Sequence, residues 1–211
     1  IPEVREHKLA MIEEVCENYD IAGLELDYLR HWGYFNMNET TSQQRRDIMT
    51  DFIKRVRKVL DKTSELGQYR WLCVRIPCYT AWFNNLGIDL TRWHEAGVDM
   101  FNVSASYFTI QQTDMAEIKQ KVPNAAVYLE MCHTTRLGTK LTGSGGYDSS
   151  TFRRTTPLQY YTAAHLAYAR GLDGVSLFNF VYYREHGNPN RGPWNEPPFK
   201  ICEHLDDPGW L

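Results

Sequence analysis

The sequence lacks several features that would place it outside the ordinary globular proteins. It has no uninterrupted run of ~18 apolar residues, so it predicts no membrane-spanning helix. It has no excess of basic residues, because 23 lysines and arginines face 26 acidic residues for a net charge of -3. A nucleic-acid partner is therefore not expected. The 211 residues, 43% of them hydrophobic, are enough to bury the core of one domain.

Cysteine and glycine motifs are also missing. The five cysteines form no C-x-x-C pair and no zinc-ligand spacing, so we expect free and mostly buried thiols. No Gly-rich phosphate loop follows any predicted strand, and no H-E-x-x-H pattern is present. The sequence therefore predicts neither a nucleotide cofactor nor a bound metal. The first residues do not resemble a signal peptide, and the cellular compartment stays open.

Short apolar runs alternate along the chain with segments of helical period. Strand–helix–strand connections of this length require parallel pairing, because each crossover needs a dozen or more residues. The predicted helices cover residues 3–19, 42–66, 90–96, a segment after Thr113, and 157–170. The predicted strands cover residues 21–27, 71–76, 100–104, 125–131 and 175–180.

Polar side chains interrupt most of these strands near their carboxyl ends, which distinguishes two α/β architectures. A doubly wound open sheet usually has near-continuous apolar strands. A (β/α)8 TIM barrel instead carries its active site at that rim. We therefore predict a TIM barrel in which residues 1–211 form a single partial barrel domain with strands 4 to 8. A whole barrel needs about 250 residues, so we expect the parent protein to supply the missing N-terminal part of the barrel.

Two carboxylates on the first predicted strand are the strongest chemical signal. Glu25 and Asp27 are two residues apart, so both point to the same side of the strand. Buried carboxylates are costly unless they are paired or used in chemistry. They therefore predict either acid/base or nucleophilic work, or a structural ion pair with Arg75 or Arg30.

Glu130 lies on the strand three positions further on and would face Asp27 across the mouth of a barrel. Two facing carboxylates are what glycoside hydrolysis requires, one to protonate the leaving oxygen and one to attack or activate water. A separation of about 5–5.5 Å would give retention, and about 6.5–9.5 Å inversion. We predict Asp27 and Glu130 as catalytic residues, with Glu25 modulating them. In the alternative, Glu130 only orients Arg75 or a histidine.

Aromatic and polar residues after the strands indicate a sugar ligand, because flat apolar rings exposed at a rim provide stacking surfaces. Two of the histidines, with the neighbouring carboxylates, would also suit an N/O metal site, which is the alternative use of these residues. The predicted substrate-binding residues are Arg75, Asn102, Tyr107, His31, His133, Trp32, Tyr79, Asn179 and Tyr182.

The segment YDIAGLELDYLR at residues 19–30 resembles the Y-D-V-D-G-I-x-L-D-Y-x-R segment of glycosyl-hydrolase-like TIM barrels. Residues 174–180 are similar to the closing strand of that family, whereas Ala22 stands where an acidic residue is common. The resemblance implies a glycosidase acting on a carbohydrate substrate. By analogy with the large retaining clan, Glu25 or Asp27 is the acid/base and Glu130 the nucleophile, and by analogy with amylase-like barrels the nucleophile is Asp27. A non-catalytic carbohydrate-binding barrel and a metal-assisted hydrolase remain the alternatives.

Overall fold

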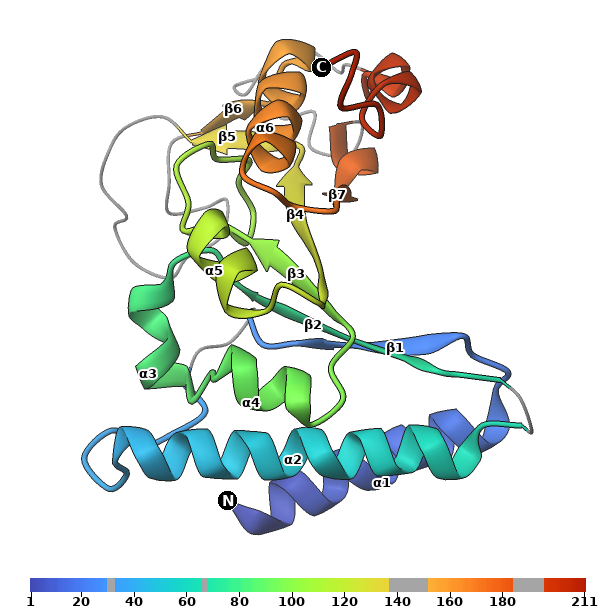
Figure 1. The fold of residues 1–211 in the computed structure, drawn as a ribbon, viewed down its shortest axis with the longest axis vertical. Helices are drawn as coiled ribbons and strands as arrows, with labels where there is room; N and C mark the ends of the chain where they lie inside the picture. Colours follow the sequence, from blue (N-terminus) through green and yellow to red (C-terminus); the bar gives the residue numbers. More distant parts are fainter. Residues whose placement is uncertain (30–32, 66–67, 137–151, 184–195) are drawn as a thin grey trace. The chain divides into compact units, whose positions relative to one another are not determined.

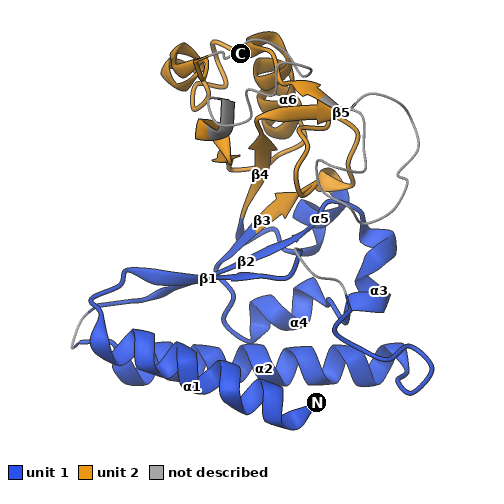
Figure 2. Cartoon of the chain, turned by 180° about the vertical axis from the view of Figure 1, so that it is seen from behind, with its two compact units in different colours: residues 1–101, 117–126 blue, residues 102–116, 127–211 orange. Residues whose placement is uncertain are grey.

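Five strands of the chain form one parallel sheet in the order β1-β2-β3-β4-β7 (Figure 1). The computed structural model describes residues 1–29, 33–65, 68–136, 152–183 and 196–211. The predicted α/β class is confirmed, and each of the five predicted strands is present with ends within two residues of the prediction. The chain divides into two compact units, Ile1–Phe101 with Glu117–Ala126 and Asn102–Ala116 with Val127–Leu211 (Figure 2).

The first unit is built around strands β1 and β2, which pair in parallel with Asp27 opposite Arg75. Helix α2 begins with a capping box, in which the Thr41 side chain accepts from the Gln44 amide and the Gln44 side chain accepts from the Thr41 amide. Helix α1 packs along α2 (Figure 1). The elements with residues in this unit are α1 (Pro2–Asn18), β1 (Gly23–Asp27), α2 (Ser42–Thr63), β2 (Trp71–Pro77), η1 (Thr80–Trp82), α3 (Phe83–Leu86), α4 (Leu90–Glu95), the start of β3 (Met100–Ser104) and most of α5 (Met115–Lys121).

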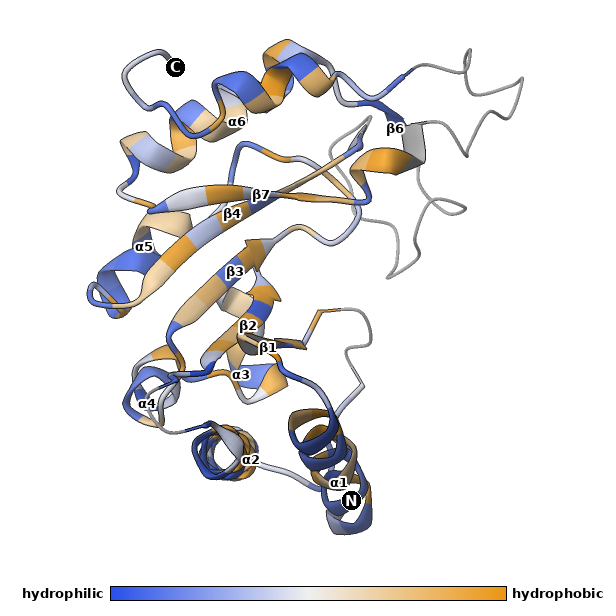
Figure 3. Ribbon diagram, turned by 90° about the vertical axis from the view of Figure 1, so that its right-hand side faces the viewer, coloured by the Kyte–Doolittle hydropathy of each residue, from blue (hydrophilic) through white to orange (hydrophobic). Residues whose placement is uncertain are grey.

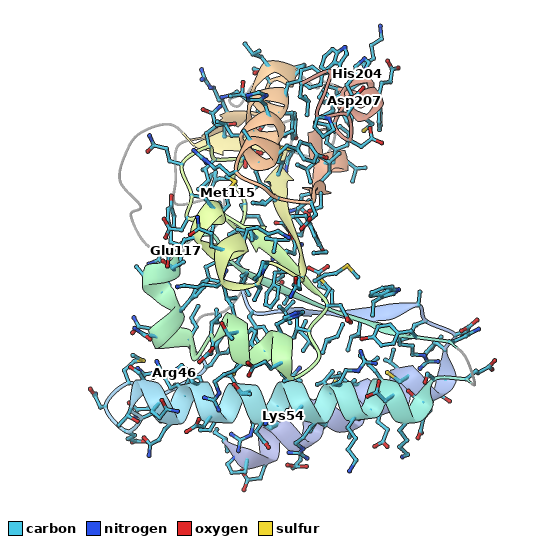
Figure 4. All side chains as sticks on the ribbon, in the orientation of Figure 1. Arg46, Lys54, Met115, Glu117, His204 and Asp207 are labelled. Atoms are coloured by element: carbon cyan, nitrogen blue, oxygen red, sulfur yellow. The ribbon has the colours of Figure 1, made fainter. Side chains whose placement is uncertain are left out.

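The long polar helix α2 buries one apolar face. Its apolar residues Ile53, Val56 and Leu60 recur at helical spacing and are completely buried. Arg46 and Lys54, labelled in Figure 4, belong to the same helix, and the guanidinium of Arg46 donates to the Asn84 side chain at 2.9 Å. Burial of the apolar stripe, rather than helix propensity, therefore fixes α2 in place.

The second unit is built around β4 and β7, which pair in parallel with Glu130 opposite Ser176. Helix α6 begins with a second capping box, formed by Thr156 and Gln159, and buries three alanines completely. A two-stranded antiparallel ribbon follows β4, and residues 137–151, between its two strands, lie outside the described residues. The further elements here are β4 (Ala126–Cys132), β5 (Thr134–Arg136), β6 (Phe152–Arg154), α6 (Pro157–Ala169), β7 (Gly174–Phe178), η2 (Phe180–Tyr183) and η4 (Phe199–Glu203).

The turns that lead into β3 and β7 share the motif Gly–apolar–Asp. Gly97 and Gly171 have φ of +102° and +85°, the left-handed region that glycine enters without a Cβ penalty. The following residues, Val98 and Leu172, are buried. The same three-residue device therefore ends a helix and starts a strand in each unit.

The aspartate of this motif forms two hydrogen bonds with the start of the neighbouring strand, which is β2 for Asp99 and β4 for Asp173. The Leu72 amide donates to Asp99 Oδ2 at 2.8 Å, and the Asp99 amide donates to the Leu72 carbonyl at 2.9 Å. The Val127 amide and Asp173 form the same pair of bonds, both at 2.8 Å. The chain turns away at the glycine, so the carboxylate supplies the acceptor that a ladder carbonyl would otherwise provide.

The cysteine prediction is confirmed. All five thiols are free; Cys16, Cys73, Cys78 and Cys132 are buried, and Cys202 is exposed. Within the described residues, no helix is both long enough and apolar enough to span a membrane.

Candidate functional site

The carboxyl end of β1 carries Asp27, and the neighbouring strand β2 carries its cationic partner Arg75. The guanidinium Nη1 of Arg75 lies 3.0 Å from Asp27 Oδ2, while the Leu29 amide donates to Oδ1 at 2.9 Å. The Arg75 side chain is only 6% exposed and that of Asp27 is 42% exposed. Both oxygens of Asp27 therefore accept hydrogen bonds. The ion pair weighed from the sequence as an alternative is present.

Two tyrosines adjoin this ion pair. Burial raises the pKa of the Tyr34 phenol, and the negative charge of Asp27 adds to that increase. Burial also raises the pKa of the Tyr28 phenol. The two rings contact each other edge to face, with centroids 6.1 Å apart. Tyr34 is thus a neutral hydrogen-bond donor beside a carboxylate.

A cavity of about 690 Å³ opens beside β1 and is bounded by residues of β1, α1 and α2. Glu25, Asp27 and Tyr34 contribute polar groups to its lining, and most of the remaining lining is apolar. Glu25 and Asp27 both line this cavity, and so do Leu24 and Leu26 between and before them on β1.

Glu130 of β4 is the central carboxylate of the second unit. Glu130 is only 5% exposed. Both of its carboxylate oxygens accept hydrogen bonds from side chains of β3. Ser104 Oγ donates to Oε1 at 2.6 Å and Asn102 Nδ2 donates to Oε2 at 3.1 Å. The 2.6 Å distance lies at the short end of the range for a hydroxyl donor.

A third strand contributes to the same network. Ser176 Oγ of β7 donates to Asn102 Oδ1 at 3.5 Å, which directs the amide NH₂ group of Asn102 towards Glu130. Ser104 is held in turn, because its Oγ accepts from the Ser106 amide at 2.9 Å. Ser104 and Asn102 thus donate to Glu130 from orientations that their own neighbours set.

Unusual backbone conformations occur where the neighbouring strands end. Ser106, just after β3, has φ of +62°, and Asn179, just after β7, has φ of +53°. They are the non-glycine residues with positive φ in the described part of the chain. Such conformations cluster at functional sites, where the surrounding structure holds them. They flank the Glu130 network in the second unit.

His133 and Cys132 follow Glu130 on the chain and are buried. Cys132 Sγ lies 3.2 Å from His133 Nδ1. Burial, with a smaller contribution from the negative charge of Glu130, raises the pKa of the Cys132 thiol to about 12. The thiol is therefore neutral near pH 7 and is not an activated nucleophile.

The carbonyl of Cys132 anchors the end of β4. It accepts from Thr109 Oγ1 at 2.6 Å, Thr155 Oγ1 at 2.9 Å and the Tyr160 hydroxyl at 3.1 Å. Three hydroxyl donors bind this one carbonyl and hold the end of the strand in place. Glu130 lies two residues earlier, so the backbone that carries its side chain is held as well.

The other predicted ligand residues are dispersed. The Tyr79 ring lies 5.6 Å from that of Trp82 in the first unit, and the Tyr107 ring lies 6.1 Å from that of Phe178 in the second. Tyr182 belongs to η2, but its side chain is outside the described part of the chain. His31 and Trp32 lie outside the described residues altogether.

The structure thus brings the predicted residues together in two sets. Asp27, Arg75 and Glu25 belong to the first unit, and Glu130 and Asn102 belong to the second. Sequence reasoning assigned no role in the site to three further polar residues, which are Ser104, Ser176 and Tyr28. Ser104 could have been found, because it shares a strand face with Asn102.

The described residues contain no group of three or more histidine, cysteine, aspartate or glutamate side chains placed to hold a metal ion. No protein-family model matches the chain, and a search of curated proteins finds no similar sequence. The chemical assignment therefore depends on the residues themselves.

Proposed function

We propose that this protein is a glycoside hydrolase in which Glu130 is a catalytic carboxylate. The observation that carries the proposal is the Glu130 network: a buried carboxylate accepts from Ser104 and Asn102, which are both neutral. A carboxylate whose two oxygens are held by hydrogen bonds can attack an anomeric carbon, or stabilise the positive charge that develops there. Of the two clan analogies, this favours Glu130 as the nucleophile.

The roles of the other two carboxylates follow from their partners. Asp27 binds the cationic Arg75 and a backbone amide, so it suits holding a charge or a substrate hydroxyl better than donating a proton. Glu25 is exposed at the cavity beside β1 and is our candidate for the acid/base. Arg75 would position Asp27 within the first unit and Asn102 would position Glu130 within the second, with Tyr79 and Tyr107 as stacking surfaces for sugar rings.

The architecture we propose is a partial (β/α)8 barrel comprising strands 4 to 8, with the remaining strands contributed by the parent protein. The parallel sheet with strands in sequential order supports this proposal, because a barrel has the same order around its axis. Active sites of such barrels lie at the carboxyl ends of the strands, where Asp27 and Glu130 are found in β1 and β4.

Hydrolysis of a panel of 4-methylumbelliferyl glycosides tests the function, comparing the unmodified protein with Glu130→Gln and with Glu203→Gln as the control. Glu203 is an exposed residue of the same unit. We expect Glu130→Gln to lower kcat by at least about 10³-fold and Glu203→Gln to leave it unchanged. Equal activity of the two variants would overturn the role of Glu130. Glycan binding without any product would instead indicate a non-catalytic carbohydrate-binding barrel.

A further inference from the structure

We infer that Ser106 is a positioning residue that acts through its backbone. Its left-handed conformation keeps the Ser106 amide bound to the Ser104 hydroxyl, and this bond directs the hydroxyl proton to Glu130. The effect on hydrolysis rests on the proposed function of Glu130. The coupling between the residues can be measured without any hydrolytic activity.

The Ser104 hydroxyl has two neighbours and a single proton. Its Oγ donates to Glu130 Oε1 at 2.6 Å and accepts from the Ser106 amide at 2.9 Å. Ser104 is the last residue of β3 and Glu130 lies within β4; both strands combine hydrophilic with hydrophobic residues (Figure 3). A serine hydroxyl can rotate, and it has one proton and two lone pairs. Because the amide binds a lone pair, the proton is directed to Glu130.

The side chain of Ser106 does not account for the backbone conformation of this residue. Its φ of +62° lies in a region that is unfavourable for residues with a Cβ atom. Asparagine and aspartate are tolerated there because their side chains bind the local backbone. The Ser106 hydroxyl forms no hydrogen bond within the described residues. The conformation is therefore imposed by the contacts of the backbone on either side.

Thr109 fixes the chain three residues after Ser106. The Thr109 amide donates to the Thr134 carbonyl at 2.8 Å. Thr109 Oγ1 donates to the Cys132 carbonyl at 2.6 Å and accepts from the Cys132 amide at 2.8 Å. Residues 106 and 107 form a turn between this attachment and the bond to Ser104. The left-handed conformation of Ser106 allows the chain to make both attachments.

The two attachments differ in strength. Thr109 forms three hydrogen bonds, and Thr109, Cys132 and Thr134 are all buried. Ser106 is attached to Ser104 by one hydrogen bond and is half-buried. A side chain that excludes the left-handed conformation should therefore break the bond to Ser104 first. The Ser104 hydroxyl could then rotate away from Glu130.

Ser106→Val tests the inference, because a β-branched residue is strongly disfavoured at positive φ. With the 4-methylumbelliferyl glycosides as substrates, we expect kcat to fall at least about tenfold and KM to stay within about twofold. Ser106→Gly enters the left-handed region without a Cβ penalty and should keep kcat within about twofold. Ala105→Val is the matched control, because it adds the same side chain to a residue whose φ is not positive.

A double-mutant cycle with Ser104→Ala separates positioning from a merely structural role. Because Ser106 acts through the Ser104 hydroxyl, Ser106→Val should lower kcat by less than about twofold when Ser104 is already alanine. A tenfold loss in both backgrounds would overturn the inference, as would equal kcat values for Ser106→Val and Ser106→Gly. If Ser106→Val fails to fold, the β-branched variant Ser106→Thr replaces it in the cycle.

Urea unfolding of the same variants needs no substrate. The midpoint shift caused by Ser106→Val should be less than half as large in the Ser104→Ala background, because the bond that it breaks is already absent there. Equal shifts in the two backgrounds would refute the inference even if the protein hydrolyses glycosides. Coupled shifts in a protein that hydrolyses no glycoside would refute the proposed function alone.

Discussion

The two Gly–apolar–Asp turns allow a quantitative test of how the strands are held, with Asp173→Ala as the perturbation. The Val127 amide, in a completely buried residue, donates to Asp173 Oδ2 at 2.8 Å. Removing the carboxylate leaves that amide without its acceptor, which costs about 1–3 kcal/mol for a buried group. We therefore expect a loss of about 2 kcal/mol in the free energy of unfolding, and about half of that for Asp173→Asn, which keeps a neutral acceptor.

The corresponding change in the first unit should cost more. Asp99 accepts from the Leu72 amide and from the Tyr69 hydroxyl at 2.7 Å, and the Arg57 guanidinium lies 3.6 Å away. Asp99→Ala should therefore cost about 3 kcal/mol or more, because it also leaves a largely buried arginine without this carboxylate.

Urea unfolding followed by far-UV circular dichroism measures these changes, with exposed Asp206→Ala as the control. A loss of about 2 kcal/mol corresponds to a midpoint shift of roughly 1 M for an m-value near 2 kcal/mol/M. If Asp173→Ala and Asp206→Ala unfold at the same urea concentration, the carboxylate does not hold β4 and the reasoning is wrong.

Three further predictions use other parts of the structure. Iodoacetamide at pH 8 should label Cys202 alone in the folded protein, because burial raises the pKa of the Cys132 thiol to about 12 and the other thiols are buried; peptide mapping checks this, and native labelling of Cys132 would contradict it. Thr156→Ala removes the capping box of α6 and should lower the free energy of unfolding by about 1 kcal/mol, measured by urea unfolding. Thr156→Ser keeps a capping hydroxyl and should retain most of the stability. Ser104→Ala leaves Glu130 Oε1 without its 2.6 Å hydroxyl donor and should cost about 1.5–3 kcal/mol, so an unchanged midpoint would show that this bond is not significant.

Much of the fold could be predicted because its signals are local. Apolar runs located every strand of the parallel sheet, and the helix predicted over residues 90–96 is α4, which Asp89 caps and Gly97 follows. The helix predicted over residues 157–170 is α6, which Thr156 caps and Pro157 begins. These signals involve residues within one turn of each other, so no tertiary information is needed to interpret them.

The ribbon of β5 and β6 could not be predicted in this way. Its strands are three residues each, polar, and separated by a long segment, so neither alternation nor a hairpin turn identifies them. Pairing of Thr134 with Arg154 is set by the end of β4, whose carbonyl binds Thr155. Such non-local pairing depends on tertiary contacts.

The site was predictable in its residue types but not in its groupings. The sequence identified Glu25 and Asp27 as a pair on one strand, and both lie in β1. A two-residue spacing also joins Asn102 to Ser104, yet only the three-dimensional structure assigns both to Glu130. The roles of these carboxylates in catalysis stay a prediction, because they depend on a substrate.

Covalent trapping tests the central claim most directly. The unmodified protein is incubated with 2,4-dinitrophenyl 2-deoxy-2-fluoro-glycosides. These compounds form a covalent adduct with the nucleophile of retaining glycosidases, and the adduct hydrolyses slowly. Intact mass spectrometry then detects an adduct, and peptide mapping identifies its position. We predict one fluoroglycosyl group per chain, attached to Glu130 and missing in Glu130→Gln. An adduct on Asp27 or Glu25 that forms equally in Glu130→Gln would contradict the assignment.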